Sequence, residues 1–236
     1  MSNDIKIKKG LDIKLKGEAE KAKENAIISN FFSIRPEDFH SVIPKLIAKV
    51  GAKVKAGEPI FYDKSNENVK FVSPVSGEII DIPRGDKRKI LAIKLQADKE
   101  QSYVDHGKFN LDGAKTDDLK AHLLASGCWP FIKQRPYDVI ANPEKKPKAI
   151  FVSAYASAPL SADLDFTLQG KDAELQIAIT ALGKLTEGEV HVCVGKDGNS
   201  PLANVTGATI HKVFGPHPAG NVGTQINKID PVNKGE

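Results

Sequence analysis

The sequence predicts a mixed fold, an α+β part made of short strands followed by an α/β part, and three observations support it. Val50, Val54 and Ile60 recur among small and charged residues, a spacing typical of short strands. Residues 172–186 carry apolar side chains at three- and four-residue steps, which indicates a helix, and apolar strand-like runs lie on both sides of it. Residues 142–148, rich in proline and charge, separate the two parts as a linker.

The amino-acid composition argues against several classes of function. Among 236 residues, 34 are basic and 30 acidic, so the net charge of +4 is too small to argue for nucleic-acid binding. Cys128 and Cys193 are the only cysteines and form no CxxC motif, which excludes a zinc ribbon or an iron–sulfur cluster and favours reduced, buried thiols. No apolar run approaches the roughly 20 residues that span a bilayer. We therefore expect a soluble cytoplasmic protein.

The N-terminal part, residues 1–40, is predicted as a β segment. Residues 5–17 alternate apolar side chains with lysines, which predicts strands with one solvated face, hinged at Gly10, and a loop follows over 18–25. Phe31, Phe32 and Phe39 then flank Arg35. Two interpretations stay open for these rings: packing onto the next domain, or a ligand groove.

The short-stranded domain is predicted over residues 41–98. Gly51 and Gly57 allow two sharp turns on either side of residues 53–55, and Gly77 allows a bend after residues 73–74. The connection between the two glycine-bounded phrases contains Asp63 and Lys64. Because we expect a long turn from Lys64 to residue 73, an exposed turn lysine is the main interpretation, and a covalently modified lysine is the alternative.

Residues 99–148 are predicted as a helix, an aromatic loop and a linker. The helix begins near Thr116. After it, residues 128–137 hold Trp129, Phe131, Arg135 and Tyr137 together with two prolines, a composition that predicts irregular structure. Such a loop is either packed inside or forms a recognition surface. A quinone needs ring-lined apolar contacts and a donor to its carbonyl oxygens, and Arg135 is the candidate donor.

Residues 149–236 are predicted as a Rossmann-like α/β domain. Strands are expected over residues 149–153, 189–194 and 208–214, with the 172–186 helix after the first strand. Three strands are few for an open sheet, which indicates the front part of a longer protein. The connection over residues 153–163 contains no glycine, so we predict that it forms no phosphate cradle. Residues 195–200 are better explained as a plain turn, and residues 215–223 lack the Lys-Ser/Thr pair of a P-loop.

Histidine chemistry offers one candidate. His191 and His211 lie on predicted strands without carboxylates at metal-like spacing, so packed histidines are expected there. His217 lies between two prolines in a glycine-rich loop and is the better functional candidate, with a structural role still open. No metal site and no self-contained catalytic apparatus is predicted.

Two family resemblances follow from these residues. The phrases 50–61 and 71–80 resemble the biotinyl/lipoyl hammerhead. The whole chain resembles the N-terminal part of the NqrA family, the NqrA subunit of the sodium-translocating NADH:quinone oxidoreductase. The matching phrases are residues 8–13, 50–77, 84–88, 135–136, 150–154, 159–163, 215–220 and 230–232. Residues 31–36 depart from that family, where a Tyr/Gly-rich approach to a proline is expected.

The NqrA resemblance implies a peripheral subunit on the cytoplasmic side of the bacterial inner membrane. The complex it implies passes electrons from NADH through FAD, FMN, riboflavin and iron–sulfur centres to ubiquinone or menaquinone and pumps sodium. The resemblance further implies that this chain binds no cofactor, touches the membrane only through partner subunits, and contributes to assembly and quinone contact. The candidate contacts are Trp129, Phe131, Arg135, Tyr137, Phe31, Phe32, Phe39 and His217.

Two alternatives remain. The first is a lipoyl- or biotin-type carrier domain modified at Lys64. The second is a relative of the RnfC component of the Rnf electron-transfer complex, although that family carries cysteine-rich cluster motifs and a flavin-type loop that this sequence lacks.

Overall fold

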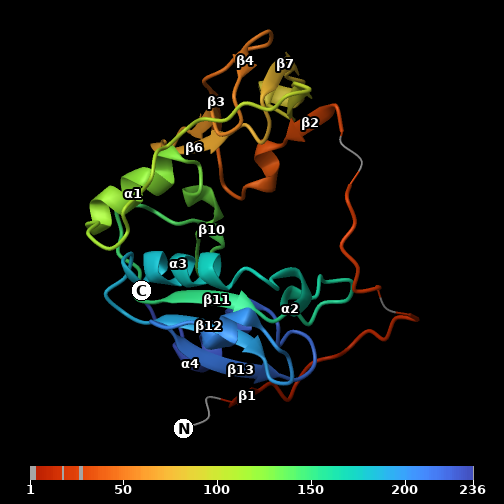
Figure 1. Cartoon of the computed structure of the whole chain (residues 1–236), viewed down its shortest axis with the longest axis vertical. Coiled ribbons are helices and arrows are strands. Elements are labelled where there is room, and N and C mark those ends of the chain that lie inside the picture. Colours follow the sequence, from red (N-terminus) through yellow and green to blue (C-terminus); the bar gives the residue numbers. More distant parts are fainter. Residues whose placement is uncertain (1–3, 18, 27–28, 236) are drawn as a thin grey trace. The chain divides into compact units, whose positions relative to one another are not determined.

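A computed structural model describes residues 4–17, 19–26 and 29–235 of the chain (Figure 1). The predicted loop over residues 18–25 therefore begins outside the described residues. The chain divides into two compact units, and each is described by itself. One, the barrel unit, spans Asn25–Glu144, and the other, the α/β unit, combines Met1–Glu24 with Lys145–Glu236. Among the described residues, no helix is both long and apolar enough to cross a membrane.

The barrel unit is built from short strands in two small sheets. One sheet has the order β2-β8-β7-β4, the other has the order β3-β5-β6, and β10 and β9 pair separately. The elements are β2 (Phe31–Ile34), η1 (Pro36–Asp38), β3 (Pro44–Leu46), β4 (Lys53–Val54), β5 (Pro59–Asp63), β6 (Asn66–Val72), β7 (Gly77–Asp81), η2 (Asp86–Arg88), β8 (Ile93–Ala97), α1 (Thr116–Ala125), η3 (Trp129–Phe131), β9 (Lys133–Gln134) and β10 (Val139–Ile140).

Glycine turns and an aromatic stack explain this arrangement. Gly51 and Gly57 both have a φ of +85°, a conformation that costs glycine little, so the predicted turns around residues 53–55 are confirmed. Inside the unit, the rings of Phe61 and Phe71 stack with centroids 4.4 Å apart. Both rings are buried and together form the centre of the apolar core.

The prediction of a long turn after Lys64 is wrong. The connection from β5 to β6 is a two-residue turn, Lys64–Ser65, and residues 66–72 continue as a strand. The buried Asp63 carboxylate closes this turn, because it accepts hydrogen bonds from the Ser65 backbone nitrogen at 3.1 Å and from its hydroxyl at 2.6 Å. The polar composition of residues 65–68 is typical of a loop, and strand pairing overrides that preference here.

The α/β unit has a four-stranded parallel sheet. Its order is β1-β13-β12-β11, and the register pairs Val152 with Val192 and Val192 with Ile210. Its elements are β1 (Asp4–Lys6), β11 (Ile150–Ala154), α2 (Leu164–Thr167), α3 (Asp172–Gly183), β12 (Val190–Gly195), η4 (Pro201–Asn204), β13 (Thr209–Phe214) and α4 (Val222–Ile229). The three strands and the long helix expected from the sequence are confirmed within a few residues of their predicted bounds.

Alternation along β12 places one helix on each face of the sheet. Val192 belongs to the buried cluster that Ile179 of α3 completes. Its neighbour Cys193 points to the opposite face and joins a second cluster, against which Ile229 of α4 packs. Figure 1 shows α3 and α4 on either side of the strands.

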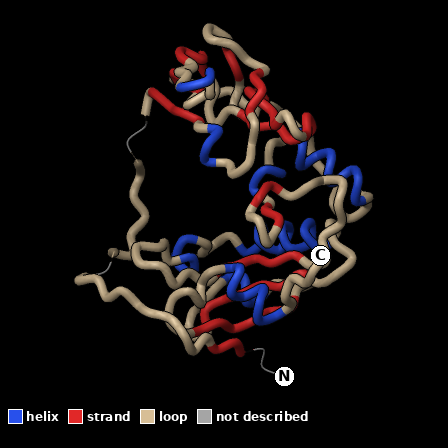
Figure 2. The backbone as a smooth tube through the Cα atoms, turned by 180° about the vertical axis from the view of Figure 1, so that it is seen from behind, coloured by secondary structure: helices blue, strands red, loops and turns tan. Residues whose placement is uncertain are grey.

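The N-terminal segment differs from its prediction. Only β1 forms a strand there, and among the described residues between β1 and β2 the chain has neither helix nor strand (Figure 2). β1 pairs in parallel with β13, Asp4 opposite Lys212, so it supplies a fourth strand to the α/β sheet and does not precede the barrel as a separate β segment. Period-two alternation identifies a strand but not the sheet that it joins. The finer division of the chain at residues 40, 98 and 148 stays a prediction.

Candidate functional site

An aromatic hairpin follows α1 in the barrel unit. We use this name for residues 129–141, which include η3, β9 and β10. β9 and β10 pair antiparallel, with Val139 opposite Gln134, so part of the stretch predicted as irregular is a short hairpin. Arg135 and Tyr137 lie in the turn that joins the two strands. The prolines confine the pairing to two residues on each strand but do not abolish it.

Trp129 anchors this hairpin from below. Its side chain is 4% exposed, and its indole Nε1–H donates a 2.7 Å hydrogen bond to the Ala141 carbonyl oxygen. Burial with a satisfied donor is the usual environment of a structural tryptophan. The sequence analysis includes Trp129 among the candidate contacts, whereas in the structure its side chain is buried and those of Phe131 and Tyr137 are exposed.

The neighbouring rings of the hairpin stand in solvent. Phe131 is 75% exposed and Tyr137 is 74% exposed. The Arg135 guanidinium lies 3.4 Å from the Asp138 carboxylate, which holds it at the same turn. A guanidinium has five N–H donors, so this ion pair leaves others available for a ligand. The hairpin thus presents two exposed rings and a partly exposed cation on one short element.

The aromatic residues near the start of the barrel unit do not join this hairpin. Phe39 packs edge-to-face on Phe71 with centroids 4.6 Å apart, so it belongs to the core stack. Phe32 is half-buried on β2, and Phe31 is 61% exposed on the same strand. No ring contact between these phenylalanines and the hairpin is found in the part of the chain that the structure describes. Of the two interpretations left open for these rings, the contact between Phe39 and Phe71 favours packing onto the barrel over a ligand groove.

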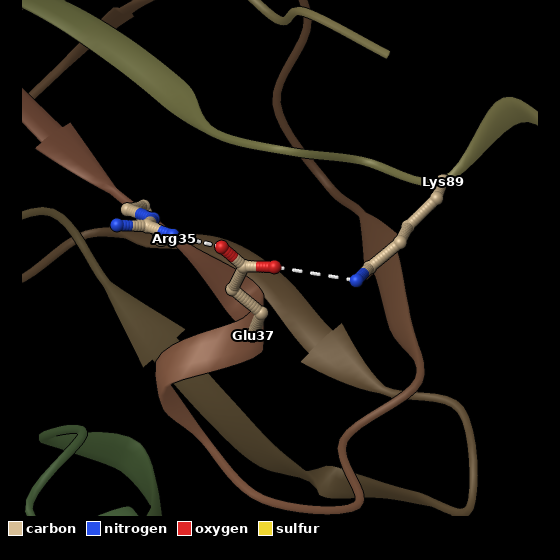
Figure 3. A network of polar contacts seen from close by, with 3 residues as sticks. All are labelled: Arg35, Glu37 and Lys89. Atoms are coloured by element: carbon tan, nitrogen blue, oxygen red, sulfur yellow. Dashed lines mark hydrogen bonds and ion pairs between the residues drawn. The ribbon is translucent and has the colours of Figure 1, made fainter. Parts of the chain in front are cut away.

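Arg35, the cation beside these rings, is already occupied (Figure 3). Its guanidinium bonds one oxygen of the Glu37 carboxylate, and the Lys89 ammonium lies 3.2 Å from the other oxygen. The hydrogen bond from Arg35, followed by that from Lys89, holds the pKa of Glu37 below its usual value. The network connects η1 to the segment before β8, so the role it supports is structural.

His217 is enclosed by hydrogen bonds of the α/β unit. Its backbone nitrogen donates to the Asp12 carboxylate at 2.9 Å, and its carbonyl oxygen accepts from the Leu11 nitrogen at 3.0 Å. The Nδ1 atom lies 3.1 Å from the Ser157 hydroxyl oxygen, which also accepts from the Gly220 nitrogen at 2.7 Å. His217 thereby ties the N-terminal segment, the 215–220 loop and the connection after β11 together.

A cavity that sequence reasoning missed lies at the carboxyl edge of the parallel sheet. It has a volume of about 380 Å³, and its floor is formed by the ends of β11, β12 and β13. The connections over residues 154–165 and 195–198 form its walls. Neither connection by itself has the sequence pattern of a phosphate loop. The carboxyl ends of parallel strands lie at the same edge of a sheet, and from this rule the two connections could have been predicted to be neighbours.

The charge of this cavity opposes phosphate binding. Its lining includes the carboxylates of Asp163, Asp165 and Asp197 and one ammonium, that of Lys196. Lys196 is already bound to the Asp4 carboxylate at 2.8 Å, and this hydrogen bond raises the pKa of Lys196. Asp163 is likewise paired, because the Lys21 ammonium lies 2.6 Å from its carboxylate. The carboxylates of Asp165 and Asp197 remain, and their negative charge would repel a diphosphate.

Two buried histidines meet on the face of the sheet that α4 covers. His191 Nδ1 lies 3.1 Å from His211 Nε2, and both side chains are 7% exposed. Burial lowers the pKa of each imidazole, and the nearby His191 lowers that of His211 further. In the described residues, no group of three or more His, Cys, Asp or Glu side chains is arranged to hold a metal ion.

Lys64 stands at the tip of the tight β5–β6 turn. Its side chain is exposed, whereas the preceding Asp63 is 8% exposed and fixes the turn. The Lys64 backbone nitrogen donates to the Ile43 carbonyl oxygen at 2.8 Å, and the Asp63 carboxylate accepts from the Ile43 nitrogen at 3.2 Å. Hydrogen bonds thus hold the backbone of Lys64 in place, while its side chain is exposed to solvent.

Comparison with known proteins gives two family matches that cover almost all of the chain. Residues 5–98 match the model described as NqrA N-terminal barrel-sandwich hybrid domain, and residues 114–236 match the model described as NqrA second alpha/beta domain. The first matched segment contains β2 to β8 of the barrel unit. The second contains α1, η3, β9 and β10 of the barrel unit and the parallel sheet apart from β1.

Curated relatives share one name, that of the NqrA subunit of the Na(+)-translocating NADH-quinone reductase. The protein from Histophilus somni strain 129Pt is 32% identical over 231 residues, which are 97% of this chain and 52% of that protein. That from Glaesserella parasuis is 33% identical over 233 residues, with the same two shares. That from Yersinia pseudotuberculosis strain IP 31758 is 32% identical over 98% of this chain and 52% of its own length. The chain spans about half the length of the curated relatives it matches.

Proposed function

Since the chain belongs to the NqrA family, we propose that it forms part of a peripheral subunit of a sodium-translocating NADH–quinone reductase. The family match along almost the whole sequence supports this role most strongly. In this proposal the subunit lies on the cytoplasmic side of the bacterial inner membrane and docks onto the other subunits of the complex. Flavins and iron–sulfur centres belong to those partners, and this chain supplies binding surfaces without catalysing a step itself.

The α/β unit is proposed as a Rossmann-like domain that does not bind dinucleotide. Its parallel strands and its cavity at the carboxyl edge support the fold assignment, and the carboxylates of that cavity argue against NADH or FMN. Isothermal titration calorimetry of the chain with NADH and with FMN tests whether the domain binds either nucleotide. We expect no heat of binding, and a saturable signal for either nucleotide would contradict it.

The aromatic hairpin is the proposed contact for quinone. Phe131 and Tyr137 offer exposed ring faces to a quinone ring, and Arg135 offers N–H donors to a quinone carbonyl oxygen. Trp129 supports the hairpin from within and serves as the reporter. Phe31 is a further exposed ring of the barrel unit. We leave three residues out of the proposed contact set: the half-buried Phe32, Phe39, which packs on Phe71, and His217, which is hydrogen-bonded within the α/β unit.

A fluorescence titration tests the quinone contact. Because Trp129 is the only tryptophan of the chain, its emission reports directly on the hairpin. We expect a water-soluble ubiquinone analogue to quench this emission saturably. The variant F131S/Y137S is expected to lose the saturable component, and the matched variant F31S, which also removes an exposed ring, is expected to retain it.

Two other results of this titration are informative. Quenching that grows linearly without saturation would remove the quinone contact. Saturable quenching that is equal in the parent chain and in all variants would show that the quinone binds outside the hairpin. A parallel capture experiment with the membrane subunits of the complex then distinguishes quinone contact from assembly, because a hairpin that only docks a partner loses capture in F131S/Y137S without any quinone effect.

A second candidate function is a carrier domain modified at Lys64. The tight two-residue turn and the exposed ammonium favour it more than the sequence did, because the expected long turn was the main argument against it. Intact-mass measurement of the chain purified from its native host tests it. We expect the unmodified mass. A lipoyl or biotinyl adduct that disappears in K64R would establish the carrier function. The Rnf alternative is set aside because both matching models describe NqrA domains.

A further inference from the structure

The segment that follows β1 is held against the α/β unit although it joins no sheet. We call residues 8–16 the amphipathic strip. The Ile7 nitrogen donates to the Phe214 carbonyl oxygen at 2.9 Å, and the Leu11 nitrogen donates to the His217 carbonyl oxygen at 3.0 Å. The Asp12 carboxylate accepts from the His217 nitrogen at 2.9 Å. The bond of Ile7 holds the residue that precedes the strip, and the two bonds of Leu11 and Asp12 hold the middle of the strip against the α/β unit.

Apolar side chains of the strip lie in solvent. Leu11 is 76% exposed, Ile13 is 64% exposed and Leu15 is 51% exposed. Figure 1 shows this red segment running without helix or strand, so its exposed side chains are not covered by pairing within a sheet. Three exposed large apolar side chains lie within five residues of one segment, a concentration that scattered single surface residues do not have.

Lysines accompany this apolar row. Lys8, Lys9, Lys14 and Lys16 are exposed, and no ion pair of theirs is found among the residues that the structure describes. Asp12 is the only acidic residue of the strip, and its carboxylate is engaged with the backbone of His217. Four lysines against one aspartate leave the strip strongly cationic beside its apolar row.

We propose that the amphipathic strip binds directly to the surface of an anionic lipid membrane. Interfacial segments of this kind place apolar side chains at the boundary between headgroups and acyl chains and cations at the lipid phosphates. Lysine stems reach from an inserted backbone back to the headgroups. A lipid surface also needs no groove of matching shape, and the exposed apolar and basic side chains of the strip suit such a surface. This goes beyond the proposed subunit role, in which contact with the membrane runs through partners.

Vesicle cosedimentation tests this proposal with the 236-residue chain. We expect binding at low salt to vesicles of equal parts phosphatidylglycerol and phosphatidylcholine, and none to vesicles of phosphatidylcholine alone. Raised salt is expected to weaken binding, because it screens the lysines. The variant K14Q/K16Q is expected to bind about fivefold more weakly for each lysine removed. The variant L11S/I13S/L15S is expected to lose at least about tenfold in affinity.

Matched variants separate the strip from the rest of the surface. K99Q/K108Q removes the same charge from exposed positions of the barrel unit, and L160S removes a side chain that is 93% exposed. Both are expected to bind like the parent chain. All these positions are exposed, and circular dichroism of each variant checks that its fold is kept.

The proposal is overturned if the strip variants bind as well as the parent chain, or if K99Q/K108Q loses as much as K14Q/K16Q. It is also overturned if the chain ignores anionic vesicles at low salt, which would leave the strip to an acidic protein partner. The quinone titration tests the barrel unit and the vesicle experiment tests the strip of the α/β unit. Either proposal can therefore be refuted while the other holds.

Discussion

The buried pair His191 and His211 makes the stability of the α/β unit sensitive to acid. Both imidazoles have a lowered pKa in the folded state, chiefly through burial, so the folded protein holds them neutral. Glu189 and Asp230 act on His191 in the opposite sense. In the unfolded chain these histidines bind protons near pH 6.5. The unfolded state therefore binds more protons as the pH falls through that value.

We expect the free energy of unfolding to be constant with respect to this pair above about pH 7 and to fall below about pH 6.5, by at most about 1.4 kcal/mol per pH unit for each imidazole. Thermal unfolding at a series of pH values between about pH 5 and pH 8 measures this pH dependence, because that range brackets the ordinary pKa of histidine. The variant H211Q keeps a hydrogen-bonding side chain without a titrating group and is expected to flatten the slope. A slope that is equal in parent and variant would place the acid sensitivity elsewhere.

Trp129 carries a second prediction about single residues. W129F keeps an aromatic ring but leaves the Ala141 carbonyl oxygen without its 2.7 Å donor. The loss of a hydrogen bond in this partly buried setting, together with the smaller ring, is expected to cost about 1–3 kcal/mol of unfolding free energy, which urea unfolding monitored by circular dichroism measures. The matched variant F131S changes a ring that is 75% exposed and is expected to stay within about 0.5 kcal/mol of the parent. Equal losses in both variants would argue against an anchoring role for Trp129.

At the scale of elements, the 215–220 loop depends on close approach to the connection after β11. A Cβ atom at Gly220 would overlap the Ser157 backbone nitrogen and the Ala156 backbone. We therefore expect G220A to displace the loop and to cost at least about 2 kcal/mol of unfolding free energy. Chemical denaturation measures this value.

Gly223 provides the matched control on α4. A Cβ atom there meets nothing within 4 Å, and alanine favours helix more than glycine does. G223A is therefore expected to be neutral or to stabilise by up to about 1 kcal/mol. If G220A proved as harmless as G223A, the close packing of the loop would not matter for stability.

Elements with strong periodic patterns could be predicted from the sequence, and elements set by pairing partners could not. β12 and α3 carry apolar runs long enough to define their type without tertiary information. β6 begins with asparagines and glutamate, and only its pairing with β5 makes it a strand. The edge position of β1 depends equally on a partner far away in the sequence.

The candidate site was predicted only in part for a related reason. Sequence reasoning grouped aromatic residues by proximity along the chain, which identified the exposed Phe131 and Tyr137. It could not distinguish them from Trp129 and Phe39, because exposure depends on packing partners that composition does not reveal. The cavity at the sheet edge was missed since its walls come from two connections far apart in sequence.

At the scale of the whole molecule, the two units differ in continuity. The barrel unit is one uninterrupted stretch, Asn25–Glu144, whereas the α/β unit needs residues from both sides of it. We expect residues 25–144, produced alone, to give a well-dispersed proton–nitrogen NMR spectrum. Residues 145–236 alone lack β1 and leave the β13 edge open, so we expect them to aggregate or to be markedly less stable. A folded, monomeric 145–236 fragment of full stability would show that β1 is dispensable.

The pairing of β1 with β13 also has a consequence during biosynthesis. Asp4 meets Lys212, so the first strand must wait at the ribosome until the barrel unit and most of the sheet have been translated. At about 5–20 residues per second, that interval is on the order of ten to forty seconds. During it, Asp4–Lys6 and the exposed apolar side chains of the amphipathic strip lack the β13 edge and the 215–220 loop against which they later lie.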